Sequence, residues 1–319
     1  MQVNELFKQS NTILLDGGMG TMLQAAGLKL GARPEELNIT DPALIEGIHG
    51  QYAAAGSRIV NANTFGASAH KLAGSAYTLE QVITAGIENC KRACAPYGAL
   101  TALDVGPLGE LLEPSGTLAF EDAVAEYARI VKAGEAAGAD LIFFETYTDL
   151  YELKAALLAA KENTHLPILA SMSFEAGGRT FTGCTVESFA ATARGLGADA
   201  VGINCSLGPK EIFPMAKRLA EAVPGNFPVF VKPNAGLPRA DGSGYDITPQ
   251  LFALQMKPYR ELHLFAAGGC CGTTPEFIKL LNGTFAGCTP GRPAHRMPSV
   301  LCTPVDTVTV DGITVVGER

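Results

Sequence analysis

The sequence predicts one (β/α)8 TIM barrel with a short C-terminal β-hairpin tail. An Ala-rich amphipathic stretch, a glycine and a short β-branched run recur as QYAAAGSRIVNANT (51–64), GEAAGADLIFFET (134–146) and RGLGADAVGINCS (194–206). The glycine is typical of a helix C-terminus, and the run is typical of a strand buried on both faces. Glycine is abundant, at 36 of 319 residues, against an average usage of about 7%. Helices that alternate with buried strands indicate a parallel sheet.

Eight such units can be counted along the chain. The expected strands are 12–16, 58–63, 99–105, 140–145, 167–173, 199–204, 228–233 and 263–269. Helical periodicity covers 42–55, 79–95, 120–137, 149–162, 186–196, 209–222, 248–257 and 275–282. Eight units in this length are close to the ~250 residues of a barrel, and an open doubly wound sheet is the alternative.

Two regions are expected, a barrel over 1–287 and a tail over 288–319. The tail begins with a proline-rich connector, and 306–317 alternates around Asp311-Gly312, a dipeptide typical of hairpin turns. The sequence VVGER follows the apolar strand residues directly. We therefore expect the tail to lead toward a further, downstream module.

Composition excludes several classes of protein. Lys and Arg number 24 against 32 Asp and Glu, for a net charge of −8, and no basic block is present, so we expect no nucleic-acid partner. The chain shows neither a signal peptide nor an apolar run of the ~18 residues that a membrane span needs. We expect a cytoplasmic protein with no membrane partner.

In that reducing compartment the eight cysteines are not expected to form a disulfide framework.

Polar residues follow nearly every expected strand, and barrel enzymes carry their chemistry at these strand ends. Asp16-Gly17-Gly18 follows the first strand, Thr64 the second, and Glu145 ends the fourth. The two carboxylates could bind a cationic group of a ligand, or form salt bridges that line the barrel. The pattern predicts a pocket for a small polar molecule.

Three cysteines follow the sixth and eighth strands. Cys205, Cys270 and Cys271 can converge because these strands are next-but-one neighbours around a barrel. Three sulfur ligands with one open position are typical of catalytic zinc. Spacing alone does not choose between this zinc site and small residues that merely pack at the rim. The other cysteines are expected to be packing residues: Cys90, Cys94, Cys184, Cys288 and Cys302.

Two further hypotheses compete for the same place. The Gly-rich turn AAGGCCGTTPEF precedes a helix, as in barrels that bind phosphate, so an aldolase or isomerase is one alternative. A non-catalytic barrel that binds a metal or thiol is another.

Several motifs resemble the homocysteine S-methyltransferase family. They are LDGGMGTMLQ (15–24), RPEELN (33–38), NANTFGAS (61–68), GPLGELLEP (106–114), FFET (143–146), GINCSLGP (202–209), KPNAG (232–236) and GGCCGTTPEFI (268–278). The chain is most similar to the N-terminal homocysteine-binding module of cobalamin-dependent methionine synthases. The resemblance implies a (β/α)8 barrel in which Cys205, Cys270 and Cys271 hold zinc.

The resemblance also implies the substrate contacts. Asp16 and Glu145 would bind the amino group of L-homocysteine, and backbone amides near Gly17, Gly18 and Thr64 would bind its carboxylate. Asn234 is expected to lie closest to the open zinc position when substrate is absent.

The implied reaction is methyl transfer to L-homocysteine, giving L-methionine. A free thiol has a pKa near ~8.5, and coordination to zinc deprotonates it. The chain contains neither the D-x-H-x-x-G motif that marks cobalamin binding in related proteins nor a folate barrel. The expected donor is therefore methylcobalamin on a corrinoid-binding module or protein, with a folate-binding module as a further partner. A stand-alone enzyme that uses betaine or S-methylmethionine is the alternative; the lack of Trp disfavours betaine, whose ammonium favours an aromatic cage.

Overall fold

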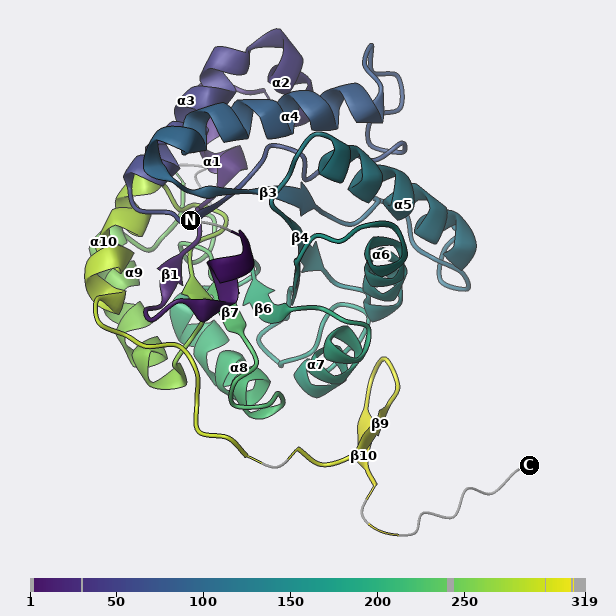
Figure 1. The fold of residues 1–319 in the computed structure, drawn as a ribbon, viewed down its shortest axis with the longest axis vertical. Helices are drawn as coiled ribbons and strands as arrows, with labels where there is room; N and C mark the ends of the chain where they lie inside the picture. Colours follow the sequence, from purple (N-terminus) through teal and green to yellow (C-terminus); the bar gives the residue numbers. More distant parts are fainter. Residues whose placement is uncertain (1–2, 30, 240–243, 296, 311, 313–319) are drawn as a thin grey trace.

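Eight parallel strands form a barrel ringed by helices in the computed structural model, which describes residues 3–29, 31–239, 244–295, 297–310 and 312 (Figure 1). The strands are β1 (Ile13–Leu14), β2 (Ile59–Asn61), β3 (Leu100–Val105), β4 (Leu141–Tyr147), β5 (Ile168–Met172), β6 (Ala200–Asn204), β7 (Val229–Lys232) and β8 (Ala266–Ala267). Each strand pairs with its sequence neighbour, and β1 pairs with β8. A parallel bridge between Leu15 and Ile59 joins β1 to β2 and closes the ring. The predicted barrel is confirmed, and the open sheet is excluded.

Every predicted helix is present. The helices are α3 (Pro42–Ala54), α4 (Leu79–Cys94), α5 (Phe120–Ala136), α6 (Leu150–Asn163), α7 (Val186–Gly195), α8 (Pro209–Glu221), α9 (Pro249–Met256) and α10 (Pro275–Phe285). The sequence did not predict the short helices α1 (Met19–Ala25) and α2 (Leu37–Thr40), nor the 3-10 segments η1 (Val3–Lys8), η2 (Pro34–Glu36), η3 (Ala95–Tyr97) and η4 (Lys257–Leu262).

The recurring glycines end helices, as expected. Gly56, Gly138 and Gly197 have φ angles of 112°, 84° and 90°. Such left-handed geometry is readily accessible only to glycine, and it turns the chain from a helix into the next strand.

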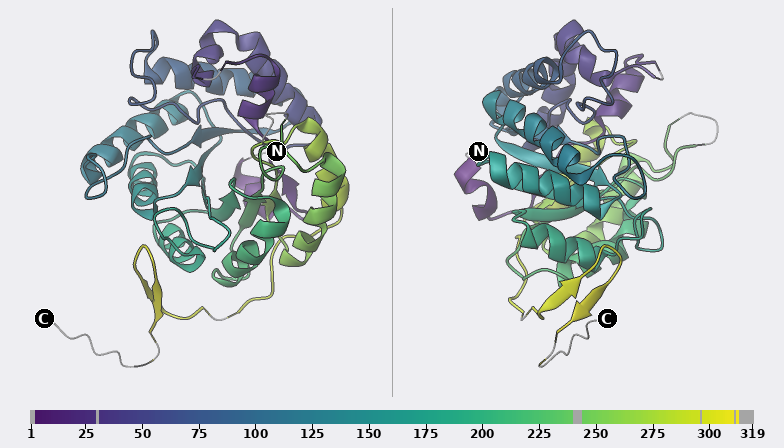
Figure 2. Two further views of the ribbon diagram at one scale, coloured as in Figure 1. Left: turned by 180° about the vertical axis from the view of Figure 1, so that it is seen from behind. Right: turned by 90° about the vertical axis from the view of Figure 1, so that its right-hand side faces the viewer.

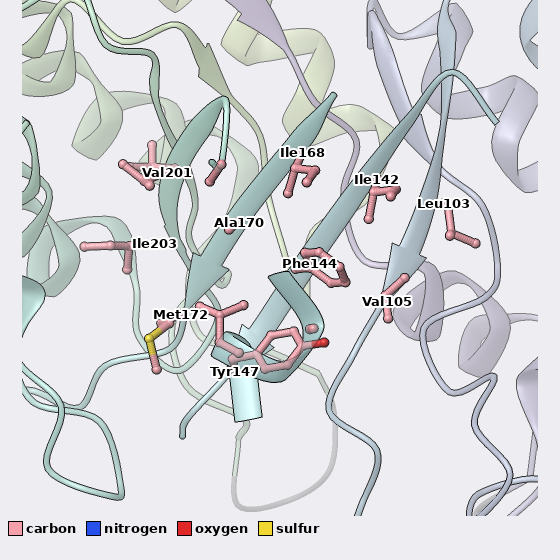
Figure 3. Packing of buried hydrophobic residues seen from close by; sticks show 14 of the residues in the cluster. Leu103, Val105, Ile142, Phe144, Tyr147, Ile168, Ala170, Met172, Val201 and Ile203 are labelled. Carbon is pink, nitrogen blue, oxygen red and sulfur yellow. The ribbon is translucent and has the colours of Figure 1, made fainter. Parts of the chain in front are cut away.

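Apolar side chains form two layers. One fills the barrel interior and includes Phe143 and Phe230, whose ring centroids lie 5.0 Å apart. The other lies between the strands and the helices; Figure 3 shows its part over β3 to β6. Leu6 of η1 packs into the interior layer, so the N-terminal segment covers the end of the barrel opposite the functional strand ends.

The tail forms a hairpin beside α7 (Figure 2). Its antiparallel strands are β9 (Val300–Cys302) and β10 (Thr307–Thr309). The turn of this hairpin lies at 303–306, where Thr303 Oγ1 accepts hydrogen bonds from the amides of Val305 and Asp306. The strand expected after Gly312 lies outside the described residues.

Across the helices that the structure describes, none is both long enough and apolar enough to span a membrane.

Candidate metal and substrate site

The barrel mouth carries a layer of buried polar side chains. Strand alternation explains it: the side chains of Ala102, Phe143 and Phe230 point into the barrel, so the residues two positions later do so as well. Those residues are Asp104, Glu145 and Lys232, and all are buried. The apolar interior is thus capped by charge at its open end.

The predicted convergence of three cysteines is confirmed. Cys205 follows β6, and Cys270 and Cys271 follow β8; their Sγ atoms all lie within 4.8 Å of one another. The Sγ atoms of Cys205 and Cys271 are 3.7 Å apart. Tetrahedral zinc with Zn–S bonds of about 2.3 Å requires S···S separations of about 3.8 Å. The three residues therefore fit zinc, by both donor chemistry and spacing.

The backbone around the cysteines is specialised. Cys205 and Ser206 have φ angles of 63° and 61°, a left-handed conformation that L-residues adopt at a cost. Gly272 has φ 79°, and a Cβ on it would lie 2.3 Å from the ring of Tyr245. The turn after β8 therefore requires glycine at position 272, and Tyr245 packs against that turn.

The thiols influence one another strongly. Hydrogen bonds from Cys270 and Cys271 lower the pKa of Cys205 to about 3. Donating to this thiolate raises the pKa of Cys271 to about 12 and that of Cys270 well above its usual value. A cluster of this kind holds one negative charge by itself and needs a cation to ionise further.

Asn204, which the sequence analysis did not assign, supports the cluster. Its Nδ2 donates to Cys270 Sγ (3.8 Å) and to Thr146 Oγ1 (2.8 Å). Its Oδ1 accepts from the amide of Thr146 and from the hydroxyl of Ser171, both at 2.9 Å. A single buried amide thus ties the ends of β4 and β5 to Cys270, which follows β8.

Asp16 and Glu145 both form ion pairs with one lysine, as in the salt-bridge alternative that the sequence left open. Lys232 Nζ is 3.0 Å from Asp16 Oδ1 and 2.9 Å from Glu145 Oε2. Asp16 Oδ2 also accepts from the amide of Asn61 at 2.7 Å. No motif in the sequence assigned a role to Lys232, although its place two residues after Phe230 indicates that it points inward.

Burial and charge compete in this group. Burial raises the pKa of Asp16 and of Glu145, and the Lys232 ammonium opposes that rise. Burial and the nearby Glu145 raise the pKa of Asp104 well above its usual value, which favours its neutral form. Burial alone would lower the pKa of Lys232, but the attraction of Asp16 and Glu145 raises it well above 10.5.

The carboxylates and the cysteines line one cavity of about 330 Å³. Asp16, Glu145 and Lys232 form part of its wall, with Gly17 and Gly18, and all three cysteines also line it. This volume is near the lower end of the ~300–1,000 Å³ usual for small-molecule sites. The cavity therefore suits a small ligand that carries both sulfur and charge.

The predicted backbone donors differ in their availability. Gly18 N donates to Thr273, and Thr64 N donates to Ala62. Within the described part of the chain, Gly17 N has no acceptor. Thr64 and Asn234 are not among the described residues that line the cavity.

Asn234 supports the cysteines from outside the cavity. It is buried, and its Oδ1 accepts from the amide of Cys271 at 3.0 Å. In this structure the side chain therefore orients the turn that carries Cys271.

The turn after β8 does not resemble a phosphate cradle. Its amides are already used: Gly269 donates to Asp16 O, Cys270 to Pro233 O, and Gly272 to Thr21 Oγ1. Cys271 N donates to Asn234 Oδ1, so the four successive backbone amides of residues 269–272 all form hydrogen bonds within the protein. The hydrogen bonding therefore disfavours the aldolase or isomerase alternative.

The remaining cysteines are free thiols. Cys90, Cys94, Cys184 and Cys288 are buried, as expected for packing residues. Cys302 departs from that expectation, because it lies on β9 and is exposed.

Comparison with known proteins identifies the family. The model of the homocysteine S-methyltransferase family matches residues 13–285. The chain belongs to this family.

Its relatives include much longer proteins. Methionine synthases of Mycobacterium tuberculosis and Mycobacterium leprae are each 32% identical over 95% of this chain. The chain spans only 27% of their length. Among solved structures, the homocysteine methyltransferase MmuM from Escherichia coli, in its oxidized form, matches 88% of this chain and 98% of its own. It does so with a TM-score of 0.74 and 24% identity, which establishes a shared fold.

Proposed function

We propose that this family member catalyses zinc-dependent methyl transfer to the thiol of L-homocysteine, giving L-methionine. One observation carries the proposal: three cysteines with zinc-compatible spacing and two buried carboxylates line the same small cavity. A thiol and an ammonium group on one small substrate match these two features. Family membership supports the same substrate.

Cys205, Cys270 and Cys271 would hold the zinc. When bound there, zinc lowers the pKa of a substrate thiol, so that the thiol reacts as a thiolate near neutral pH. Asn204 and Asn234 hold the cysteine-bearing turns in place through their hydrogen bonds.

The chain's other residues would orient the substrate. Asp16 and Glu145 would bind its ammonium group, and the backbone at Gly17, Gly18 and Thr64 would bind its carboxylate. Of these amides, Gly17 N is the one without an acceptor in the described structure. The sulfur gains the methyl group, the thiol proton leaves to water, and the electrons of the broken bond stay with the donor.

We propose methylcobalamin on a corrinoid-binding module or protein as the donor, with a folate-binding module as a further partner. The match to about a quarter of each mycobacterial methionine synthase supports a division of labour among modules. In this proposal residues 1–287 form the homocysteine-binding barrel, and 288–319 connect it to the next module. The proposed location is the cytoplasm.

Zinc content and turnover test the proposal together. We expect the purified protein to hold about one zinc per chain and Cys270→Ser to lose both zinc and activity. Cys302→Ser is the matched control, because Cys302 is exposed and distant in the fold, and it should keep both. Zinc retained in full by Cys270→Ser would rule the site out.

Donor identity needs a separate assay. Homocysteine is offered with methylcobalamin, betaine or S-methylmethionine, and methionine is measured. We expect turnover with methylcobalamin; turnover with betaine or S-methylmethionine alone would replace the corrinoid donor with a stand-alone reaction.

A further inference from the structure

Lys232 is the only cation in the cluster of carboxylates that lines the described cavity. It ends β7, is 2% exposed, and bridges Asp16 from the end of β1 and Glu145 from β4. Its Nζ also lies 5.0 Å from the centroid of the Phe143 ring. A buried lysine is costly unless it is paired, and this one has two partners on two other strands.

The charges do not cancel. Asp16 and Glu145, when both are ionised, outnumber the single ammonium group of Lys232, so these three side chains together carry a net charge of −1. One further ammonium group brings the cluster to neutrality. A substrate with one ammonium group therefore completes the cluster electrically.

Acceptor capacity is available for that group. Among the described residues, no hydrogen-bond donor reaches Glu145 Oε1 or Asp104 Oδ1. Both residues line the cavity. An ammonium group has three N–H donors, so it can use oxygens that Lys232 leaves free.

Lys232 also determines whether both carboxylates can be ionised. Two carboxyl groups that share a buried site without a cation cannot both carry charge at low cost. One would take up a proton, and that carboxyl group could then no longer form an ion pair with a substrate ammonium group. The lysine removes this repulsion.

We propose that Lys232 is a positioning residue: its two ion pairs keep Asp16 and Glu145 both ionised and fixed in place, so that their remaining oxygens can receive the ammonium group of the substrate. This inference rests on the proposed function and adds a positioning residue to the same site.

The first experiment compares Lys232→Met with the zinc-loaded wild type. Calorimetry measures binding of L-homocysteine and of 4-mercaptobutanoate, which has the thiol and carboxylate but no ammonium group. We expect homocysteine affinity to fall on the order of tenfold or more, because one carboxyl group becomes protonated and both lose the contact that orients them. Affinity for 4-mercaptobutanoate and zinc content should stay near the wild-type values.

Lys154→Met is the matched control. Lys154 also lies over an aromatic ring, 5.9 Å from the centroid of Phe120, but it is exposed and outside the cavity. It should bind both thiols like the wild type.

A double variant separates charge from packing. Glu145→Gln alone leaves a net charge of zero, whereas Glu145→Gln with Lys232→Met restores −1. We expect the double variant to bind homocysteine more tightly than Glu145→Gln and to melt at a higher temperature than Lys232→Met. If the losses of the two single variants simply add in the double variant, Lys232 only packs. If Lys232→Met does not fold, the comparison of the double variant with Glu145→Gln decides, and weaker homocysteine binding by the double variant would overturn the role of Lys232.

The outcomes distinguish the two proposals. If the wild type binds homocysteine and Lys232→Met binds it equally or more tightly, the role of Lys232 is overturned while the function stands. If the zinc-loaded wild type binds no homocysteine, both fall.

Discussion

His49 shows how a buried titratable residue can matter outside the candidate site. It lies on α3, and its Nε2 has no hydrogen-bond partner in the described structure. Burial lowers its pKa from 6.5 to about 3. The folded protein therefore holds this imidazole neutral over a range in which the unfolded chain protonates it.

This difference predicts a loss of stability in acid. Between pH 6.5 and about 3 the unfolded state binds one more proton than the folded state, so His49 removes stability as the pH falls through that window. The slope is up to about 1.4 kcal/mol per pH unit. We expect His49→Leu to unfold with a shallower pH dependence than the wild type, as measured by urea denaturation at pH 7, 6 and 5.

A surface histidine provides the comparison. His165 is exposed in the segment before β5, so His165→Leu removes an exposed imidazole and leaves the buried one of His49 in place. If both variants shift the acid limb of the stability curve equally, burial of His49 is not the cause.

At the scale of elements, β6 is fitted closely to β7. A Cβ on Gly202 would lie 2.3 Å from Cε2 of Phe230, a ring in the barrel interior. The glycine is needed because the aromatic ring fills the space of its missing side chain.

Gly202→Ala should therefore destabilise the barrel by about 1–3 kcal/mol, the usual cost of overpacking. Gly195→Ala is the control: Gly195 ends α7, and a Cβ added to it would meet no atom within 4 Å, so stability should hold or rise slightly. Chemical denaturation measures both. Adding Phe230→Leu should recover part of the loss, and no recovery would contradict this account.

Sequence periodicity predicted the large elements well, for a physical reason. Strands buried on both faces and amphipathic helices each bury a regular set of side chains, and glycines such as Gly56 mark their junctions. The short helices α1 and α2 were not predicted, because their seven and four residues are too few to show a helical period. The hairpin of β9 and β10 was not predicted, because its turn is closed by the hydroxyl of Thr303 and not by a glycine-containing dipeptide.

The site was predictable in part. Cysteines and carboxylates at strand ends were found because the barrel directs all these ends to one mouth. Lys232 and Asn204 were missed because their roles depend on partners far away in the sequence. Lys232 contacts Glu145, 87 residues away, and Asn204 contacts Cys270, 66 residues away. Such pairings follow from closure of the barrel and not from any local pattern.

At the scale of the whole molecule, the two ends of the barrel differ. Leu6 of η1 packs into one end, while the loops that follow the strands surround the other. Large apolar side chains are exposed on those loops: Phe181 after β5 (76%) and Leu237 after β7 (56%). These two side chains are therefore apolar groups that a protein approaching the mouth could contact.

The proposed corrinoid carrier would have to approach this mouth, because the candidate metal site opens there. Phe181→Ser with Leu237→Ser should therefore reduce turnover by roughly tenfold when the methyl group is presented on a corrinoid protein, and leave turnover with free methylcobalamin unchanged. Leu254→Ser is the matched control, since Leu254 is equally exposed (56%) but lies on α9 in the outer ring of helices. Steady-state rates with the two donors measure the difference. Equal losses with both donors would mean that these loops shape the cavity itself, and no loss with either would mean that the carrier binds elsewhere on the barrel.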